Sequence, residues 1–205
     1  NFMLQGLEVE PNPLLTSNTD ATQLETVYED DYLLVVNKPA GMLSVPGKNG
    51  QASVQSLLRK RYPEAKGQLT VHRLDMDTSG IILFARNPVA SSALQKQFEE
   101  HSISKTYKAK LSKTIEGQDL RTGDKGEIRL PLSADYDERP RQKVDPQQGK
   151  NALTEYEVTS VESDGSIGIV YHPHTGRTHQ LRVHSAHILG LGHPIKGDLL
   201  YGGAP

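Results

Sequence analysis

The sequence contains no cysteine, and this absence excludes three kinds of chemistry. A disulfide scaffold, a thiolate nucleophile and a zinc site with cysteine ligands all require a residue that the chain lacks. A protein without cysteine is compatible with a reducing compartment, so we expect a cytoplasmic protein.

Long apolar runs and aromatic residues are also scarce. No stretch of about 18 apolar residues occurs, so the sequence predicts no membrane-spanning helix. The first residues do not place a basic stretch before an apolar one, so they do not resemble a secretory signal. Aromatic residues make up only 5% of the chain, so a core must come mainly from leucine, valine and isoleucine.

The net charge is −2, but the charges are distributed unevenly. Residues 1–31 carry seven acidic residues and no lysine or arginine, which leaves the remainder of the chain at +5. A mild basic excess permits binding to a polyanion through a local patch without requiring it. We expect residues 1–25 to form an acidic tail or linker and residues 26–205 to form one domain.

Short apolar patterns predict many strands and a few helices. Ser53 is the expected N-cap of a helix that reaches Arg61, and Pro88 is expected to begin a second helix. A third helix is expected to carry Leu181, Ser185, Ile188 and Leu189, and residues 133–151 are expected to form a loop. The expected strands are residues 27–28, 33–36, 80–85, 105–111, 127–132, 154–161 and 167–171. The pattern predicts an α+β fold with a mixed, mainly antiparallel sheet.

Asp75 is a candidate catalytic carboxylate in the segment VHRLDMDTSG, residues 71–80. It follows His72 and Arg73 and precedes turn-forming residues and an apolar strand. A carboxylate between cationic neighbours and a tight turn suits catalysis. From the local pattern alone, however, a surface loop with a local Arg–Asp contact is the more common explanation.

Six of the eight histidines lie between His172 and His193. Imidazole is a common metal ligand, and the pair His172 and His174 suggests zinc. No Asp or Glu occurs between Tyr171 and Gly197, however, and metal-bound histidines commonly have such a partner. The pattern therefore gives only weak support to a metal-dependent hydrolase.

Basic and polar side chains in the same region suit a phosphate backbone. Arg177 and Arg182 enclose Thr178, His179 and Gln180 directly after a glycine. A solvated helix start explains the same residues equally well. Farther upstream, Tyr107 lies between Lys105 and Lys108; this combination occurs at base-stacking surfaces, although a strand tyrosine more often packs in a core.

Three motifs in this order resemble those of the RluA-type pseudouridine synthases. They are VHRLDMDTSG at residues 71–80, KTYKA at residues 105–109 and GRTHQLRVH at residues 176–184. Further matches are NKPAGMLSVPG, RPRQKV, TEYEV and GHPIKGDLLYG, and together they cover residues 26–203. The resemblance implies a split, mainly antiparallel sheet with a central active-site cleft, in which residues 26–205 are the catalytic domain.

The resemblance also implies the reaction. Uracil is detached from C1′ of a uridine in ribosomal or transfer RNA, rotated and rejoined through C5, with no cofactor and no metal. Asp75 would be the catalytic carboxylate, attacking either C1′ or C6, and Arg182 would form an ion pair with it. Tyr107 would stack on the target base and is a candidate for the base that removes the C5 proton.

The same resemblance assigns the RNA contacts. Arg73 would help to displace the target nucleotide, a base-flipping step. His72 is expected to be a structural hydrogen-bonding residue. The other residues expected to bind RNA are Arg177, His179, Gln180, Arg141 and Lys143. RNA is the expected partner. The protein is expected to act as a monomer and not to associate with a membrane.

Two departures from the family pattern leave alternatives open. Related chains usually continue past GDxxYG to an RxxLHA-like segment, so we expect the domain to be truncated at its C-terminus. We also expect no basic helical domain before the body. A non-catalytic RNA-binding module of the same fold is therefore the second interpretation, and a metal-dependent hydrolase that uses the histidine cluster is the third.

Overall fold

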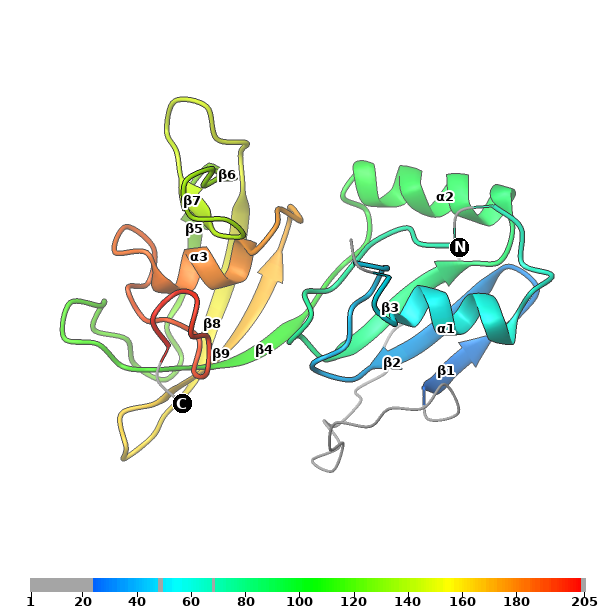
Figure 1. Cartoon of the computed structure of the whole chain (residues 1–205). Coiled ribbons are helices and arrows are strands. Elements are labelled where there is room, and N and C mark those ends of the chain that lie inside the picture. The colour runs from blue at the N-terminus through cyan, green and yellow to red at the C-terminus, as the bar shows by residue number, and fades with distance from the viewer. Residues whose placement is uncertain (1–23, 48–49, 68, 204–205) are drawn as a thin grey trace. The chain divides into compact units, whose positions relative to one another are not determined.

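The computed structural model describes residues 24–47, 50–67 and 69–203. These residues form two compact units, which meet in the sequence between Ser102 and Ile103. The expected tail, residues 1–25, lies almost entirely outside the described residues. Each unit has its own sheet (Figure 1).

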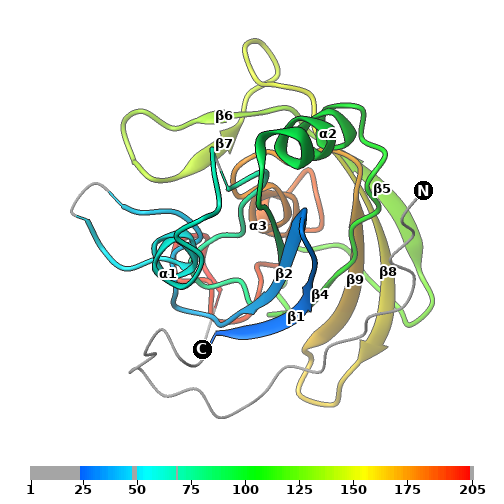
Figure 2. The ribbon, with the colours of Figure 1, turned by 90° about the vertical axis from the view of Figure 1, so that its right-hand side faces the viewer.

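The first unit is built on a three-stranded antiparallel sheet in the order β1-β2-β3. The strands are β1 (Glu25–Glu29), β2 (Leu33–Lys38) and β3 (Gly80–Ala85). Leu33 and Leu83 of this sheet pack against α2 (Pro88–Glu99), while residues at the alternate positions, such as Leu34 and Phe84, are fully buried. Figure 2 shows α1 (Val54–Arg61) and α2 on either side of these strands. A sheet covered on both sides explains why β2 and β3 are apolar runs with little alternation.

Local capping explains where both helices begin. Ser53 accepts a hydrogen bond from the backbone N–H of Ser56, and the Ser56 hydroxyl accepts one from the backbone N–H of Ser53, which completes a capping box. Asn87 accepts a hydrogen bond from the N–H of Ala90, and Pro88 occupies the first helical position. The predicted starts at Ser53 and Pro88 are confirmed.

The second unit contains a four-stranded antiparallel sheet in the order β4-β9-β8-β5. The strands are β4 (Tyr107–Leu111), β5 (Lys125–Arg129), β8 (Leu153–Val161) and β9 (Ile167–Pro173). α3 (Gln180–Ala186) lies beside this sheet (Figure 2). The hydroxyls of Tyr171 on β9 and Ser185 on α3 are hydrogen bonded. In β4 and β9, more buried residues alternate with less buried ones, as the sequence predicted for β4.

Three predictions in this unit are wrong. Residues 133–151 are not a plain loop, because β6 (Leu132–Ala134) pairs antiparallel with β7 (Gln142–Val144). The strand expected at residues 127–132 is divided between β5 and β6. The third helix ends at Ala186, so Ile188 and Leu189 lie outside it and are exposed.

The observed fold is α+β with antiparallel sheets, as predicted. Throughout the described part of the chain, no helix combines the length and the apolar character needed to cross a membrane.

Candidate active site

Asp75 lies at the start of a turn between the buried Leu74 and strand β3. The backbone N–H of Thr78 donates to the Asp75 carbonyl over 3.1 Å, which closes the turn. On the preceding side, the Ser44 hydroxyl accepts from the Leu74 N–H at 3.0 Å and donates to the Leu74 carbonyl at 2.7 Å. These contacts fix the backbone that carries the half-buried Asp75 side chain.

Lys38, the last residue of β2, holds the other side of this turn. Its side chain is fully buried, and its ammonium group donates to the carbonyls of Pro39 (3.0 Å), Met42 (2.7 Å) and Met76 (2.8 Å). Met76 directly follows Asp75. Burial lowers the pKa of Lys38 to about 8, while the negative charges of Asp77 and Asp75 act in the opposite direction.

The residues just before Asp75 differ in their roles. His72 accepts a hydrogen bond from the backbone N–H of Leu83 through Nε2 (2.8 Å), and its ring stacks on Phe98 with centroids 4.7 Å apart. This confirms the structural role that we expected for His72. Arg73 is exposed, which leaves it accessible to a ligand.

Arg182, in the second unit, is held rigidly on α3. Its Nε and Nη2 atoms donate to the two carboxylate oxygens of Asp198 over 2.7 and 2.8 Å, a bidentate ion pair. The Asp198 side chain is only 7% exposed and that of Arg182 is 22% exposed, so solvent screens this pair little. The guanidinium group also lies 5.0 Å from the centre of the Tyr201 ring.

Tyr201 connects three parts of the second unit. Its hydroxyl accepts from the backbone N–H of Gln142 on β7 (2.7 Å) and lies 2.8 Å from His179 Nδ1, at the start of α3. Arg141 lies 5.5 Å from its ring centre on another side. Asp198 and Tyr201 thus fix Arg182 and the residues around it. The sequence motifs included both residues, but their roles were not predicted.

Replacing Asp198 with alanine is expected to destabilise the protein by about 2 kcal/mol. This value lies between the roughly 0–1 kcal/mol of exposed ion pairs and the roughly 3–5 kcal/mol of buried ones. Asp119→Ala is the matched control, because the Asp119–Arg121 pair is about 80% exposed on both side chains and is expected to contribute under about 0.5 kcal/mol. Urea unfolding of both variants measures the difference; equal losses would contradict the expectation.

The other predicted site residues also lie in the second unit. Tyr107 is half-buried at the start of β4, paired with Tyr171 of β9. Gln180 is buried and its side-chain amide is fully engaged: Oε1 accepts from Thr175 and from the Arg177 N–H, and Nε2 donates to Thr154 and Leu153. Gln180 therefore holds the turn that presents Arg177.

Lys143 lies on β7 and Arg141 directly precedes that strand, while Asp75 and Arg73 belong to the first unit. Arg141 forms an ion pair with Glu138 over 2.8 Å, whereas Lys143 is exposed. The predicted ion pair between Asp75 and Arg182 would join residues of different units, and it stays a prediction.

The histidine cluster is divided among structural hydrogen bonds. His184 and His193 are fully buried: His184 contacts Thr154 Oγ1 and the Leu130 carbonyl, and His193 accepts from the Thr114 N–H and contacts the Gln118 carbonyl. His174 pairs with Glu155 at 2.9 Å on the surface. Within residues 24–47, 50–67 and 69–203, no three histidine or acidic side chains are arranged to hold a metal ion.

Comparison with known proteins identifies the family. A family model described as RNA pseudouridylate synthase matches residues 32–187. The chain belongs to the RNA pseudouridylate synthase family. A relative from Haemophilus ducreyi, called dual-specificity RNA pseudouridine synthase RluA, is 45% identical over 180 residues, which are 87% of this chain and 77% of that protein. The protein of the same name from Escherichia coli K12 is 44% identical over equal shares.

Solved structures agree. The human RNA pseudouridylate synthase domain containing 1 superposes with a TM-score of 0.72 at 29% identity, over 92% of this chain and 74% of that one. The human domain containing 4 has a TM-score of 0.68 at 25% identity, over 88% and 70% of the two chains. This RNA pseudouridylate synthase is thus an isomerase that converts uridine in RNA to pseudouridine, and neither the binding-module nor the hydrolase alternative is favoured.

Proposed function

We propose that this pseudouridine synthase modifies uridines in both ribosomal and transfer RNA, acting as a monomer in the cytoplasm. Support for more than one substrate comes from the relatives at 44–45% identity, whose name describes a dual specificity. RNA with a folded loop is the suitable form of the substrate. An unstacked base in such a loop can be flipped out at a low cost.

In this proposal, Asp75 is the carboxylate that reacts with the target nucleotide. The supporting observation is that the chain is fixed on both sides of Asp75, by Ser44 on Leu74 and by Lys38 on Met76. A nucleophile gains rate from such positioning, because little conformational freedom remains to be lost in the transition state. The half-buried carboxylate stays accessible to a ligand.

The remaining residues take roles around the flipped nucleotide. Tyr107 stacks on the target uracil and is the candidate base for the C5 proton, and Arg182 is the catalytic arginine, its orientation fixed by Asp198. Arg73 occupies the space that the flipped base leaves. Arg177, Arg141 and Lys143 contact RNA phosphates, with His179 beside them. Gln180 acts through Arg177 by holding its backbone N–H.

Tritium release from RNA that contains uridine labelled at C5 tests this function. The wild-type protein is expected to release tritium from a ribosomal fragment and from a transfer RNA, because forming the new bond at C5 displaces the label. Release from neither RNA would contradict the proposed function. Release from only one would contradict the dual specificity and leave the chemistry in place.

A further inference from the structure

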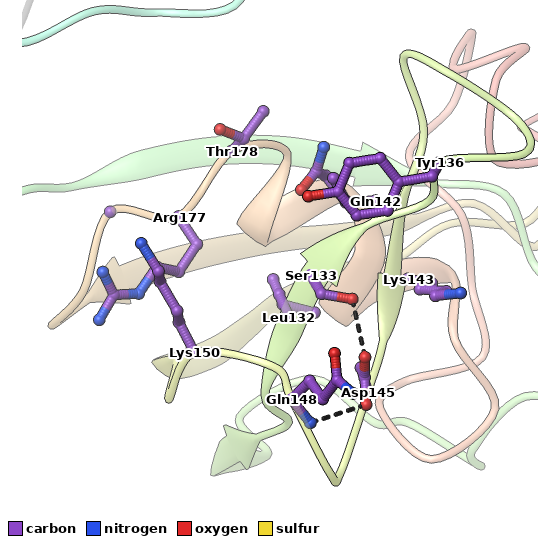
Figure 3. A pocket seen from close by; sticks show the side chains of 12 residues that line it. Leu132, Ser133, Tyr136, Gln142, Lys143, Asp145, Gln148, Lys150, Arg177 and Thr178 are labelled. Atoms are coloured by element: carbon purple, nitrogen blue, oxygen red, sulfur yellow. Dashed lines mark hydrogen bonds between the residues drawn. The ribbon is translucent and has the colours of Figure 1, made fainter.

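A polar cavity lies beside the β6–β7 hairpin, and Arg182, Asp198 and Tyr201 do not line it. Its volume is about 570 Å³ (Figure 3). One wall comes from the hairpin and its connecting loop, and the other from the turn at Gly176, Arg177 and Thr178. The residues of the hairpin, and of the turn that follows β7, that line it are Leu132, Ser133, Ala134, Tyr136, Gln142, Lys143, Asp145, Gln148 and Lys150.

Three cations and one carboxylate line this cavity. The carboxylate, Asp145, is engaged by its own turn: it accepts from the backbone N–H groups of Gln148 (3.0 Å) and Gln147 (3.1 Å) and from the Ser133 hydroxyl (3.0 Å). These hydrogen bonds lower the pKa of Asp145, and the one from the Gln148 N–H has the largest effect. Asp145 therefore shapes the turn and leaves an excess of positive charge in the cavity.

Of the cations, Lys143 acts on Asp145 through its charge, which also lowers the pKa of that carboxyl. In the described residues, Lys143, Lys150 and Arg177 form no ion pair with a carboxylate. Four arginines elsewhere in this unit do: Arg121, Arg129, Arg141 and Arg182. Arg177, the arginine of the cavity lining, thus differs from these four in having no carboxylate partner, which favours an anion from outside the chain.

The backbone holds two of these cations in place. Lys150 exchanges both backbone hydrogen bonds with Leu132, at 2.8 and 3.0 Å, and the preceding Gly149 lies too close to the backbone of Asp145 to carry a side chain. Arg177 donates from its N–H to Gln180 and from Nε to the Asn151 carbonyl, at 3.0 Å each. The terminal guanidinium nitrogens remain available. Figure 3 shows the Lys150 and Arg177 side chains extending on the same side.

An aromatic ring completes the lining. Tyr136 is 72% exposed, and the guanidinium group of Arg139 lies 4.9 Å from its ring centre. An exposed ring supported by an arginine suits contact with a nucleotide. Lys143 lies apart from Lys150 and Arg177 in Figure 3, across the hairpin. Separated cations fit a chain of phosphates better than a single small anion, which would need donors that converge on one point.

We propose that this cavity binds the phosphodiester backbone of the substrate RNA away from the target uridine, with Lys150 and Arg177 on one phosphate and Lys143 on a neighbouring one. The inference rests on the proposed function, because it takes RNA as the substrate. It adds Lys150 and Tyr136 to the RNA-binding residues. Contacts of this kind position the RNA without reading its sequence, so one cavity serves ribosomal and transfer RNA alike.

The test measures the affinity of Lys150→Glu for a substrate RNA as salt is varied. The variant is expected to raise Kd about tenfold at low salt and to reduce the slope of log K against log[salt] by about 1. Lys113→Glu is the matched control, because this substitution makes the same change of charge. Lys113 is exposed in the same unit and lies outside the cavity. We expect its Kd to stay within about twofold of wild type.

Two outcomes would overturn the inference. If Lys150→Glu and Lys113→Glu change Kd equally, with both variants folded by thermal melting, the cavity is not an RNA site. If inorganic phosphate protects the wild type against thermal unfolding but not Lys150→Glu, while both bind RNA equally, the cavity takes a small anion and the proposal fails. Tritium release by the wild type is measured in parallel, so failure of the proposed function is seen separately from failure at this cavity.

Discussion

Asp75→Asn is expected to abolish tritium release, by roughly 10³-fold or more, while RNA binding survives. The asparagine keeps the size of the side chain and removes the negative charge. Both proposed routes, attack at C1′ of the ribose and addition at C6 of the uracil, need that charge on an unprotonated oxygen. A neutral amide is a poor nucleophile, so neither route remains. Single-turnover tritium release and a parallel binding titration measure the two effects.

The chain offers a close control for this variant. Asp77 lies in the same turn and is exposed, so Asp77→Asn removes an equal charge two residues away. We expect Asp77→Asn to retain activity within about threefold, since only the charge at Asp75 reacts. If both variants lose activity equally, the loss reflects the charge of the turn as a whole. Undiminished release by Asp75→Asn would contradict the proposed mechanism.

Local sequence rules predicted the elements whose causes are local. The starts of α1 and α2 were found because Ser53 and Pro88 act on backbone groups within one turn. The β6–β7 hairpin was missed because its strands have only three residues each and no tight-turn dipeptide joins them. The end of α3 was misplaced because Ile188 and Leu189 continue its apolar spacing although both are exposed.

The candidate site shows the same division. The roles of Asp75, Tyr107 and Arg182 were predicted from family motifs. The local pattern around each residue is equally compatible with a purely structural role. Lys38 was missed, since a lysine beside Asn37 and Pro39 suggests an exposed strand end. Its burial depends on three carbonyls, one of which belongs to Met76, 38 residues away. Such a pairing arises only from the fold, and no spacing rule in one sequence reports it.

Lys38→Met is expected to lower the free energy of unfolding by about 2–4 kcal/mol. Methionine retains most of the apolar stem, so the variant removes mainly the donors to Pro39, Met42 and Met76. Met42 has a buried carbonyl contact with Lys38, and an unpaired buried polar group costs about 1–3 kcal/mol. Lys60→Met, on the exposed end of α1, is the matched control and is expected to change stability by under about 0.5 kcal/mol.

Activity provides the second measurement on Lys38→Met. The Met76 carbonyl keeps its hydrogen bond from the Gly41 N–H but loses the one from Lys38. The backbone beside Asp75 is therefore held less firmly, and kcat is expected to fall by up to about 10²-fold in the folded variant. Full kcat in a folded Lys38→Met would show that Lys38 stabilises the unit without positioning Asp75.

The pH dependence of this stability loss has a definite sign. Burial lowers the pKa of Lys38 from 10.5 to about 8, so between these values the folded protein binds fewer protons than the unfolded chain. The contribution of Lys38 to the free energy of unfolding is then least favourable below pH 8 and rises from about pH 8 to about pH 10.5. Methionine does not titrate, so the stability gap between wild type and Lys38→Met is expected to widen between about pH 7 and about pH 9.5. Urea unfolding at both values measures the gap, and a gap that stays constant would mean that the proton affinity of Lys38 is the same in the folded and unfolded chains.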